Sequence, residues 1–214
     1  TTLDGRVATR AGESQWITGA AARQDAMRWR RLFPAVGAGA GTVRADDPRL
    51  TSRLGGREWR PARLIFDRSL RTATGGKLPR VYRDAGKGKV IVVSGPKPEK
   101  KGRTRLEKIG VEVWALPAEG RKYFTTLREK CAAAGLTGVL IEGGPGLLSA
   151  FLAAKELDYL FAYRAPKFFA DAEAKAALTG PARPDLAQAY ALAEVRHAVL
   201  GEDELMRGRV VYPR

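Results

Sequence analysis

A glycine-rich turn directly follows a short apolar run in the second half of the chain. The run Val139–Ile141 leads into Glu142 and then into Gly143–Gly146, which includes a proline. Glycine lets the backbone approach a ligand closely, and proline suits the first turn of a helix. The first N–H groups of a helix have no partner within it and carry partial positive charge, so they bind phosphate well. The segment therefore predicts an anion site at a helix N-terminus. The alternative is a tight turn from strand to helix in which glycine is needed only because a larger side chain would not fit.

A second glycine-rich segment, Val36–Thr42, also follows a short apolar run. It has G-x-G spacing but lacks the full G-x-G-x-x-G pattern, and the expected acidic residue does not follow, so a Rossmann dinucleotide site is a poor match. No Walker A lysine is present either, which argues against a nucleotide-hydrolysing P-loop. A backbone contact to an anion and simple tight packing both stay open for this segment.

Two further segments combine polar and aromatic residues. The segment Gly12–Thr18 contains Trp16, whose ring should pack either on a flat ligand or in the core. The segment Thr42–Arg53 contains paired aspartates before a proline, which often cap or turn the chain. Its arginines could instead bind a phosphate through two parallel hydrogen bonds.

Rare residues limit the possible chemistry. The chain has one histidine, His197, and one cysteine, Cys131, so a Ser-His-Asp triad and a zinc site are both disfavoured and no metal is expected. A lone cysteine cannot form an internal disulfide, which favours a reduced, cytoplasmic setting. No apolar run approaches the roughly 20 residues that span a bilayer, so no membrane partner is expected.

The composition indicates an ordinary globular protein. The length of 214 residues favours a single domain that spans residues 1–214. The formal net charge is +15, and the stretch Arg57–Lys130 alone holds 20 Lys/Arg against 8 Asp/Glu. Such a basic surface can bind nucleic acid, attract small phosphorylated molecules, or simply stay solvated. The most basic run, Lys97–Lys108, contains no aromatic residue that could stack on a base, which weakens the nucleic-acid interpretation.

Hydrophobic periodicity predicts the elements that would position these residues. A helix should begin after Thr18 as N-cap and run to about Leu32, and Gly55–Pro61 and Gly95–Gly102 should be surface loops. The remaining expected elements are strands at Ala35–Ala38, Ala62–Phe66, Lys89–Val93, Val111–Leu116, Val139–Ile141 and Tyr159–Ala165, helices at Tyr123–Ala134 and Leu147–Ala154, and a hairpin over Tyr190–Tyr212 that turns near Gly201. This order favours a mostly parallel sheet covered by helices and finished by antiparallel edge strands.

Several motifs in this order resemble one known family. They are T-L-D-G-R-V-A-T (Thr2–Thr9), G-E-S-Q-W-I-T (Gly12–Thr18), G-A-G-T-V-R-A-D-D-P-R-L-T (Gly39–Thr51) and E-G-G-P-G-L-L (Glu142–Leu148). Together they resemble the reductase domain of bacterial riboflavin-biosynthesis enzymes, which is the C-terminal half of the bifunctional deaminase–reductase RibD. The resemblance covers nearly the whole chain.

The resemblance implies a dihydrofolate-reductase-like three-layer α/β fold. This fold has a mostly parallel central sheet, helices on both faces and a C-terminal antiparallel hairpin. The implied reaction is the NADPH-dependent reduction of the ribosyl group of 5-amino-6-(5-phosphoribosylamino)uracil to ribityl, in a cytoplasmic homodimer. The implied cofactor contacts are Trp16, Thr42, Asp46, Gly143, Gly144, Pro145, Gly146, Leu147, Leu148, Ser149 and Ala150. The implied substrate contacts are Ser14, Arg30, Leu50, Arg53 and Glu142, with the two arginines on the 5-phosphate, and Asp46 and Glu142 are the candidate proton relays.

The chain departs from the family pattern in three ways. The apolar strand that usually precedes T-L-D-G is not in the sequence, so we expect an N-terminal strand to be missing. Arg68 stands where many relatives carry a small polar residue, and it could bind the 2′-phosphate of NADPH. The zinc-deaminase signature is absent, so a deaminase would have to be fused to the chain or act before it.

Several alternatives to this reaction remain from the sequence, among them a catalytically inactive domain that serves only as a scaffold. A related reductase could act on the diaminopyrimidine substrate before deamination. The chain could be a dihydrofolate-type reductase, although Arg30 and Arg53 favour a phosphosugar substrate. It could also be a basic nucleic-acid-binding module.

Overall fold

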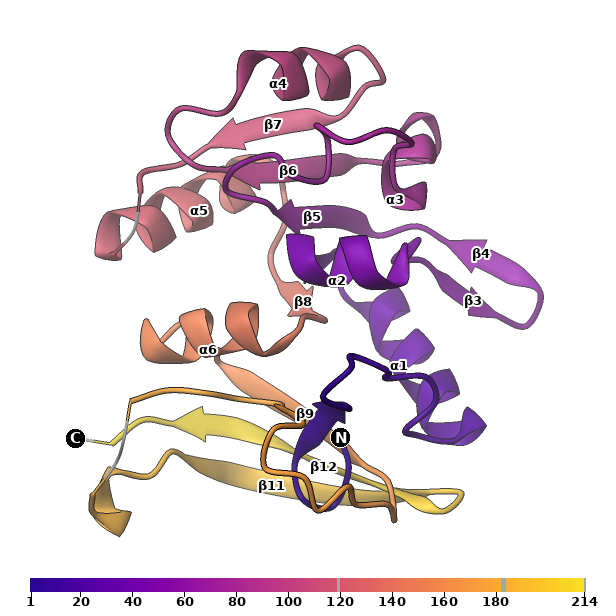
Figure 1. Ribbon diagram of the computed structural model, residues 1–214, viewed down its shortest axis with the longest axis vertical. Coiled ribbons are helices and arrows are strands. Elements are labelled where there is room, and N and C mark those ends of the chain that lie inside the picture. The colour runs from indigo at the N-terminus through magenta and orange to yellow at the C-terminus, as the bar shows by residue number, and fades with distance from the viewer. Residues whose placement is uncertain (119, 182–183, 214) are drawn as a thin grey trace. The chain divides into compact units, whose positions relative to one another are not determined.

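A five-stranded parallel sheet forms the centre of one compact unit, Met27–Leu147, in the computed structural model (Figure 1). The structure describes residues 1–118, 120–181 and 184–213. The sheet has the order β7-β6-β5-β2-β8. Its strands are β2 (Ala35–Gly39), β5 (Ala62–Phe66), β6 (Val90–Ser94), β7 (Glu112–Ala115) and β8 (Val139–Ile141). Every residue of β5 and β6 is buried, as expected for short apolar runs inside a parallel sheet covered on both faces.

Helices cover both faces of this sheet. They are α2 (Ala40–Asp46), α3 (Arg80–Arg83), α4 (Lys100–Glu107) and α5 (Arg121–Ala133), with a short 3₁₀ turn, η1, at Ala85–Lys87. The chain passes from β2 through β5 and β6 to β7, and then returns to β8 on the other side of β2. Because parallel crossovers are right-handed, this reversal places α5 on the face opposite to α2, α3 and α4. Figure 1 shows α2 and α3 in front of the sheet and α5 behind it.

The main hydrophobic core of this unit lies between the sheet and its helices. Its members include Val36, Ile65 and Val92 from the strands, with Val81 and Leu106 from α3 and α4, and these five side chains are fully buried. This close packing fixes the strand ends that carry the polar residues.

Antiparallel strands form the second compact unit, which combines Thr1–Ala26 with Leu148–Arg214. Its three-stranded sheet has the order β11-β12-β9, and a separate pair joins β1 to β10. The strands are β1 (Arg6–Ala8), β9 (Tyr159–Arg164), β10 (Lys175–Ala176), β11 (Ala191–Leu200) and β12 (Asp203–Val211), with a 3₁₀ turn, η2, at Leu186–Gln188. The β11–β12 hairpin turns at Gly201, whose φ of 69° suits glycine, so the predicted C-terminal hairpin is confirmed.

Two helices contain the boundaries between the units: α1 (Ala20–Leu32) and α6 (Pro145–Ala153). The helix predicted to end at Leu32 is confirmed, although it begins one residue later than a Thr18 cap would give. Within the described residues, no helix is long and apolar enough to cross a membrane.

Two predicted loops are partly wrong. The stretch Gly55–Pro61 contains β4 (Arg57–Trp59), which pairs with β3 (Ser52–Leu54) around two glycines of positive φ. The stretch Gly95–Gly102 ends inside α4, because Gly102 packs against Leu70 and Thr74 and is buried there.

Candidate active site

The start of α2, directly after β2, and the turn that follows β8 meet at one edge of the parallel sheet. Because both strands run in the same direction, their carboxyl ends lie together. The N–H of Gly144 donates a hydrogen bond of 3.1 Å to Oγ1 of Thr42, and the N–H of Glu142 donates one of 2.8 Å to the carbonyl of Gly37. From β2 the chain adds strands on one side of the sheet, and it then returns to place β8 on the other side of β2. Open α/β sheets bind ligands at such points, where the order of strands reverses.

Gly37 allows the close approach of β8. A Cβ added there would lie 2.7 Å from Cδ1 of Ile141 and 3.0 Å from a ring carbon of Phe66. Real Cβ atoms do not approach other atoms that closely, so glycine keeps β8 near enough to hold Glu142 at the sheet edge.

An ion pair of Arg30 with Glu142 lies at the centre of the site. Nε and Nη2 of Arg30 donate to the two carboxylate oxygens over 2.7 and 2.5 Å, and Nη1 donates to the carbonyl of Thr51 over 2.9 Å. Only 15% and 26% of the two side chains are exposed. Burial alone would lower the pKa of Arg30, but the hydrogen bond and the charge of Glu142 outweigh it, so the pKa is raised and the cation is stable.

The segment Leu50–Arg53 is fixed beside this pair. The hydroxyl of Ser52 donates a 2.6 Å hydrogen bond to the carbonyl of Met27 in α1, and Leu50 is buried with a φ of 54°. Arg53 is exposed, and it has no ion-pair partner among the described residues. This arginine is therefore available to an anionic ligand.

The first turn of α6 has the properties of an anion site. It contains no acidic side chain, so its N–H groups keep their partial positive charge. A Cβ added at Gly146 would meet no atom within 4 Å, so the space beside the helix start is open. A Cβ at Gly143 would instead lie 3.2 Å from Cδ2 of Leu147. The first turn therefore offers backbone donors and room for a diphosphate.

Asp46 and Arg68 follow the neighbouring strands β2 and β5, Asp46 as the last residue of α2 and Arg68 two residues after β5 ends. Asp46 ends α2 and is exposed as a residue, yet neighbouring atoms desolvate its carboxyl in part and raise its pKa. Arg68 follows β5, and its carbonyl accepts a 2.9 Å hydrogen bond from the N–H of Gly95 after β6. Burial raises the pKa of Tyr123 to about 12, against the opposing charge of Arg68.

The remaining expected residues lie in the unit of Thr1–Ala26 and Leu148–Arg214. Trp16 exposes 63% of its surface, and the guanidinium of Arg23 lies 4.4 Å from its ring centroid, so its ring is not in the core. The hydroxyl of Ser149 accepts a 2.8 Å hydrogen bond from the N–H of Thr179. Ser14, Leu148 and Ala150 belong to the same unit, and the ligand roles of all five residues stay predictions.

Sequence reasoning did not find three contributors to the site. These are Met27 and Thr51, which act through their carbonyls, and Ser52 through its hydroxyl. The one available signal was that Thr51 and Ser52 are sequence neighbours of Arg53. A contact through a backbone carbonyl does not depend on the residue type, so the sequence alone does not predict it.

Comparison with known proteins decides the family. A model of the RibD C-terminal domain family matches residues 1–204. The chain belongs to this family. The riboflavin biosynthesis protein RibD of Bacillus amyloliquefaciens is 34% identical over 164 residues, which cover 77% of this chain and 43% of the relative. The protein of the same name from Actinobacillus pleuropneumoniae is 29% identical over 213 residues, 99% of this chain and 55% of the relative.

Solved structures of RibD proteins share the fold of this chain. Form 2 of Acinetobacter baumannii RibD gives a TM-score of 0.81 at 29% identity, over 98% of this chain and 55% of that one. A Thermotoga maritima protein gives a TM-score of 0.76 at 27% identity, over 99% of this chain and 54% of that one. It is named a diaminohydroxyphosphoribosylaminopyrimidine deaminase/5-amino-6-(5-phosphoribosylamino)uracil reductase. These likenesses confirm the expected dihydrofolate-reductase-like fold. The chain spans about half the length of the curated relatives it matches.

Proposed function

We propose that this RibD C-terminal domain reduces the ribosyl group of 5-amino-6-(5-phosphoribosylamino)uracil to ribityl, with NADPH as hydride donor. The observation that carries the proposal is the Thr42–Gly144 hydrogen bond, which joins the first turn of α2 to the turn after β8, next to the Arg30–Glu142 pair. A helix N-terminus suited to a diphosphate and a polar pair suited to a heterocycle then share one sheet edge. The name of the Thermotoga maritima relative gives this uracil as the compound which that protein reduces.

The residues around the start of α6 fit a dinucleotide. The pyrophosphate would accept hydrogen bonds from backbone N–H groups at the start of α6, those of Gly146 and Leu147, with Gly143–Pro145 and Leu148–Ala150 completing the predicted set. Thr42 holds Gly144 in place, and Arg68 would bind the 2′-phosphate that distinguishes NADPH from NADH. Trp16 and Asp46 complete the proposed cofactor contacts. When bound, NADPH supplies the hydride for the reduction.

The substrate would lie against Glu142 and the arginines. Arg53 would bind the 5-phosphate, and Leu50 and Ser14 would line the site. Arg30 stays in the proposed substrate set, and because it is hydrogen-bonded to Glu142 we also assign to it the orientation of that carboxylate. As the open-chain imine accepts a hydride at its former anomeric carbon, its nitrogen must gain a proton. Glu142 or Asp46 would stabilise the protonated imine or relay that proton, and the raised pKa of Asp46 suits a proton donor.

The activity test compares two substrates under identical conditions. Loss of NADPH absorbance is followed with freshly deaminated phosphoribosylaminouracil and with its diaminopyrimidine precursor. We expect faster turnover of the deaminated compound. Preference for the precursor would assign the chain to the pre-deamination reaction, and no turnover of either would refute the proposed reductase activity.

Two sets of variants test the residue roles. Turnover should fall by about 10²-fold or more in the variant that removes the proton relay, Glu142→Gln or Asp46→Asn, and full activity in both would exclude these carboxylates. Arg68→Ala should weaken NADPH binding about tenfold while leaving NADH binding unchanged. Equal losses for the two cofactors would remove Arg68 from the 2′-phosphate site.

The proposal includes a cytoplasmic homodimer that follows a zinc deaminase in the reaction sequence. A chain with one cysteine suits a reducing compartment. Light scattering of the purified chain should give twice the 23.2 kDa mass of one copy. A single-copy mass at working concentration would contradict the dimer.

A further inference from the structure

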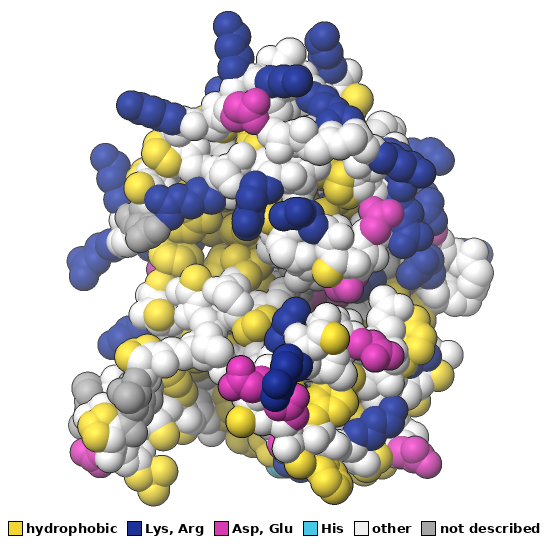
Figure 2. Space-filling view, viewed as in Figure 1, with side chains coloured by type: hydrophobic (Ala, Val, Ile, Leu, Met, Phe, Trp, Pro, Cys, Tyr) yellow, Lys and Arg dark blue, Asp and Glu magenta, His cyan; other side chains and the backbone are white. Residues whose placement is uncertain are grey.

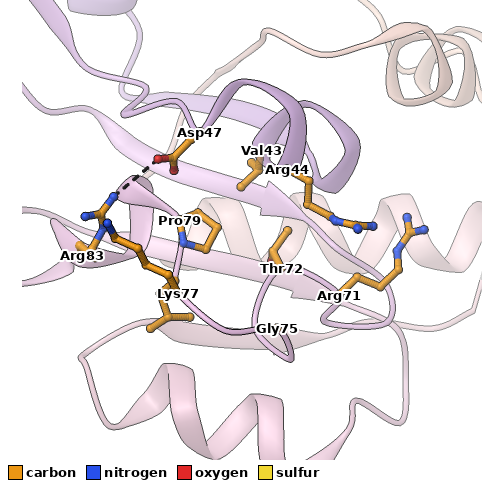
Figure 3. A pocket seen from close by; sticks show the side chains of 10 residues that line it. Val43, Arg44, Asp47, Arg71, Thr72, Gly75, Lys77, Pro79 and Arg83 are labelled. Atoms are coloured by element: carbon orange, nitrogen blue, oxygen red, sulfur yellow. Dashed lines mark ion pairs between the residues drawn. The ribbon is translucent and has the colours of Figure 1, made fainter. Parts of the chain in front are cut away.

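A hollow of about 280 Å³ lies between α2, the loop that follows β5 and the start of α3. Figure 3 shows the side chains that line it. None of them belongs to the cofactor or substrate contacts proposed above. Figure 2 shows Lys and Arg side chains gathered over the region of α2, α3 and α4, so the hollow opens in a basic part of the surface.

Positive charge dominates the lining. Arg44 and Arg71 extend to one side of the hollow in Figure 3, and Lys77 and Arg83 lie at the other. Its one acidic side chain, Asp47, forms ion pairs with Arg80 over 3.1 Å and with Arg83 over 3.5 Å.

Three of the cations that line the hollow are not paired with a carboxylate among the described residues. They are Arg44, Arg71 and Lys77. Like charges that line one concave surface repel each other, and a bound anion removes that cost.

Hydrogen bonds hold the walls of the hollow in place. The N–H and hydroxyl of Thr72 donate to Oδ2 of Asp67 over 2.7 and 2.6 Å, and the Thr72 hydroxyl also bonds that of Tyr82. Arg105 of α4 donates to the carbonyl of Ala73 over 2.9 Å and to those of the two glycines that follow in the loop. The site is therefore formed before a ligand arrives, which lowers the ordering cost of binding.

The α2 wall is tied to α3 in the same way. The backbone N–H of Arg80 donates to Oδ1 of Asp47 over 2.6 Å, and Nε of Arg80 donates to the Asp47 carbonyl over 2.8 Å. Both helices thus present their cations at a fixed separation.

We propose that this hollow binds a small free anion with at least two phosphoryl groups, independently of the nicotinamide cofactor. Arg44 and Arg71 on one side of the hollow and Lys77 on the other match two phosphoryl groups, and guanidinium groups bind phosphate through parallel hydrogen bonds. The volume of about 280 Å³ lies just below the range of common ligand pockets, about 300–1,000 Å³, which favours a compact anion over a dinucleotide.

Calorimetric titration of the full chain with pyrophosphate, at saturating NADPH, tests the proposal without any turnover. The double variant Arg44→Ala/Arg71→Ala should weaken binding about tenfold or more. A control with the same charge loss on exposed arginines, Arg57→Ala/Arg121→Ala, should stay within about threefold, and so should Arg53→Ala at the proposed substrate phosphate contact.

Three results would overturn the proposal. These are unchanged affinity in the hollow variant, an equal loss in either control, and disappearance of wild-type pyrophosphate binding once NADPH is saturating. In the last case the cofactor itself would occupy the site. If the double variant fails to fold, Lys77→Ala in the exposed loop must weaken pyrophosphate binding in the same direction.

Discussion

The Arg30–Glu142 pair offers a quantitative test of how the site is built. The perturbation is a double-mutant cycle of Arg30→Met and Glu142→Gln, made singly and together. Methionine keeps the apolar stem of the arginine, and glutamine keeps the shape of the carboxylate, so the cycle isolates the charged hydrogen bonds.

The expected magnitude follows from geometry and burial. Exposed ion pairs contribute about 0.2–1 kcal/mol, whereas removal of one partner from a buried pair costs about 3–5 kcal/mol. This pair has two short hydrogen bonds and side chains that are 15% and 26% exposed, so it lies between these limits. We expect a loss of about 2 kcal/mol for Glu142→Gln and about 3 kcal/mol for Arg30→Met, which also loses the Thr51 contact. The coupling energy should be about 2 kcal/mol.

Urea unfolding followed by tryptophan fluorescence measures all four free energies. The coupling should persist in about 1 M NaCl, because partly buried charges are screened much less than exposed ones. A coupling below about 0.5 kcal/mol, or one that high salt abolishes, would refute the reasoning, since the pair would then behave as a surface contact.

Four further substitutions have expected outcomes. Gly37→Ala should destabilise the chain by about 1–3 kcal/mol in urea unfolding, because its Cβ would lie 2.7 Å from a β8 side chain. Gly41→Ala in α2, where a Cβ meets no atom within 4 Å, should instead stabilise it by about 0.5–1 kcal/mol, and equal effects would contradict the packing argument. The free energy of unfolding of the wild type should fall as pH rises from about 10 towards the Tyr123 pKa of about 12, because in this range the Tyr123 hydroxyl ionises only in the unfolded chain. An equally large fall in Tyr123→Phe would exclude this residue as the cause. Ser52→Ala should cost about 1–2 kcal/mol and raise the KM for substrate through Arg53, whereas an unchanged KM would separate Arg53 from that hydrogen bond.

Periodicity predicted the regular elements of the fold well. The strands at Ala62–Phe66 and Val139–Ile141 are confirmed to the residue, because short apolar runs between polar segments have few alternatives in a parallel sheet. Helix α2 was not predicted, since Gly41 and Thr42 in its first turn have poor helix propensity and its stability comes from burying Ala40 and Val43. Strand β4 was hidden by its charged residues and by glycines that signalled a loop.

The site was predicted as a set of residues and not as a network. The motifs named Arg30 and Glu142 separately, with Arg30 on a phosphate. Their mutual pairing joins positions 112 residues apart, which one sequence cannot reveal. The same limit applies to the hydrogen bond between Thr42 and Gly144, 102 residues apart. The single-domain organisation over 1–214 stays a prediction beside the two compact units described above.

The continuity of Met27–Leu147 has a consequence for the order of assembly during translation. This unit is complete once Leu147 has left the ribosome, and its last strand, β8, then brings the glycine turn to Thr42. The other unit cannot close at that time, because the N–H of Ala165 donates a 2.9 Å hydrogen bond to the carbonyl of Thr1, and β1 pairs with β10. We therefore expect nascent chains to acquire the parallel sheet first, with the leading segment waiting unpaired for the residues made after it.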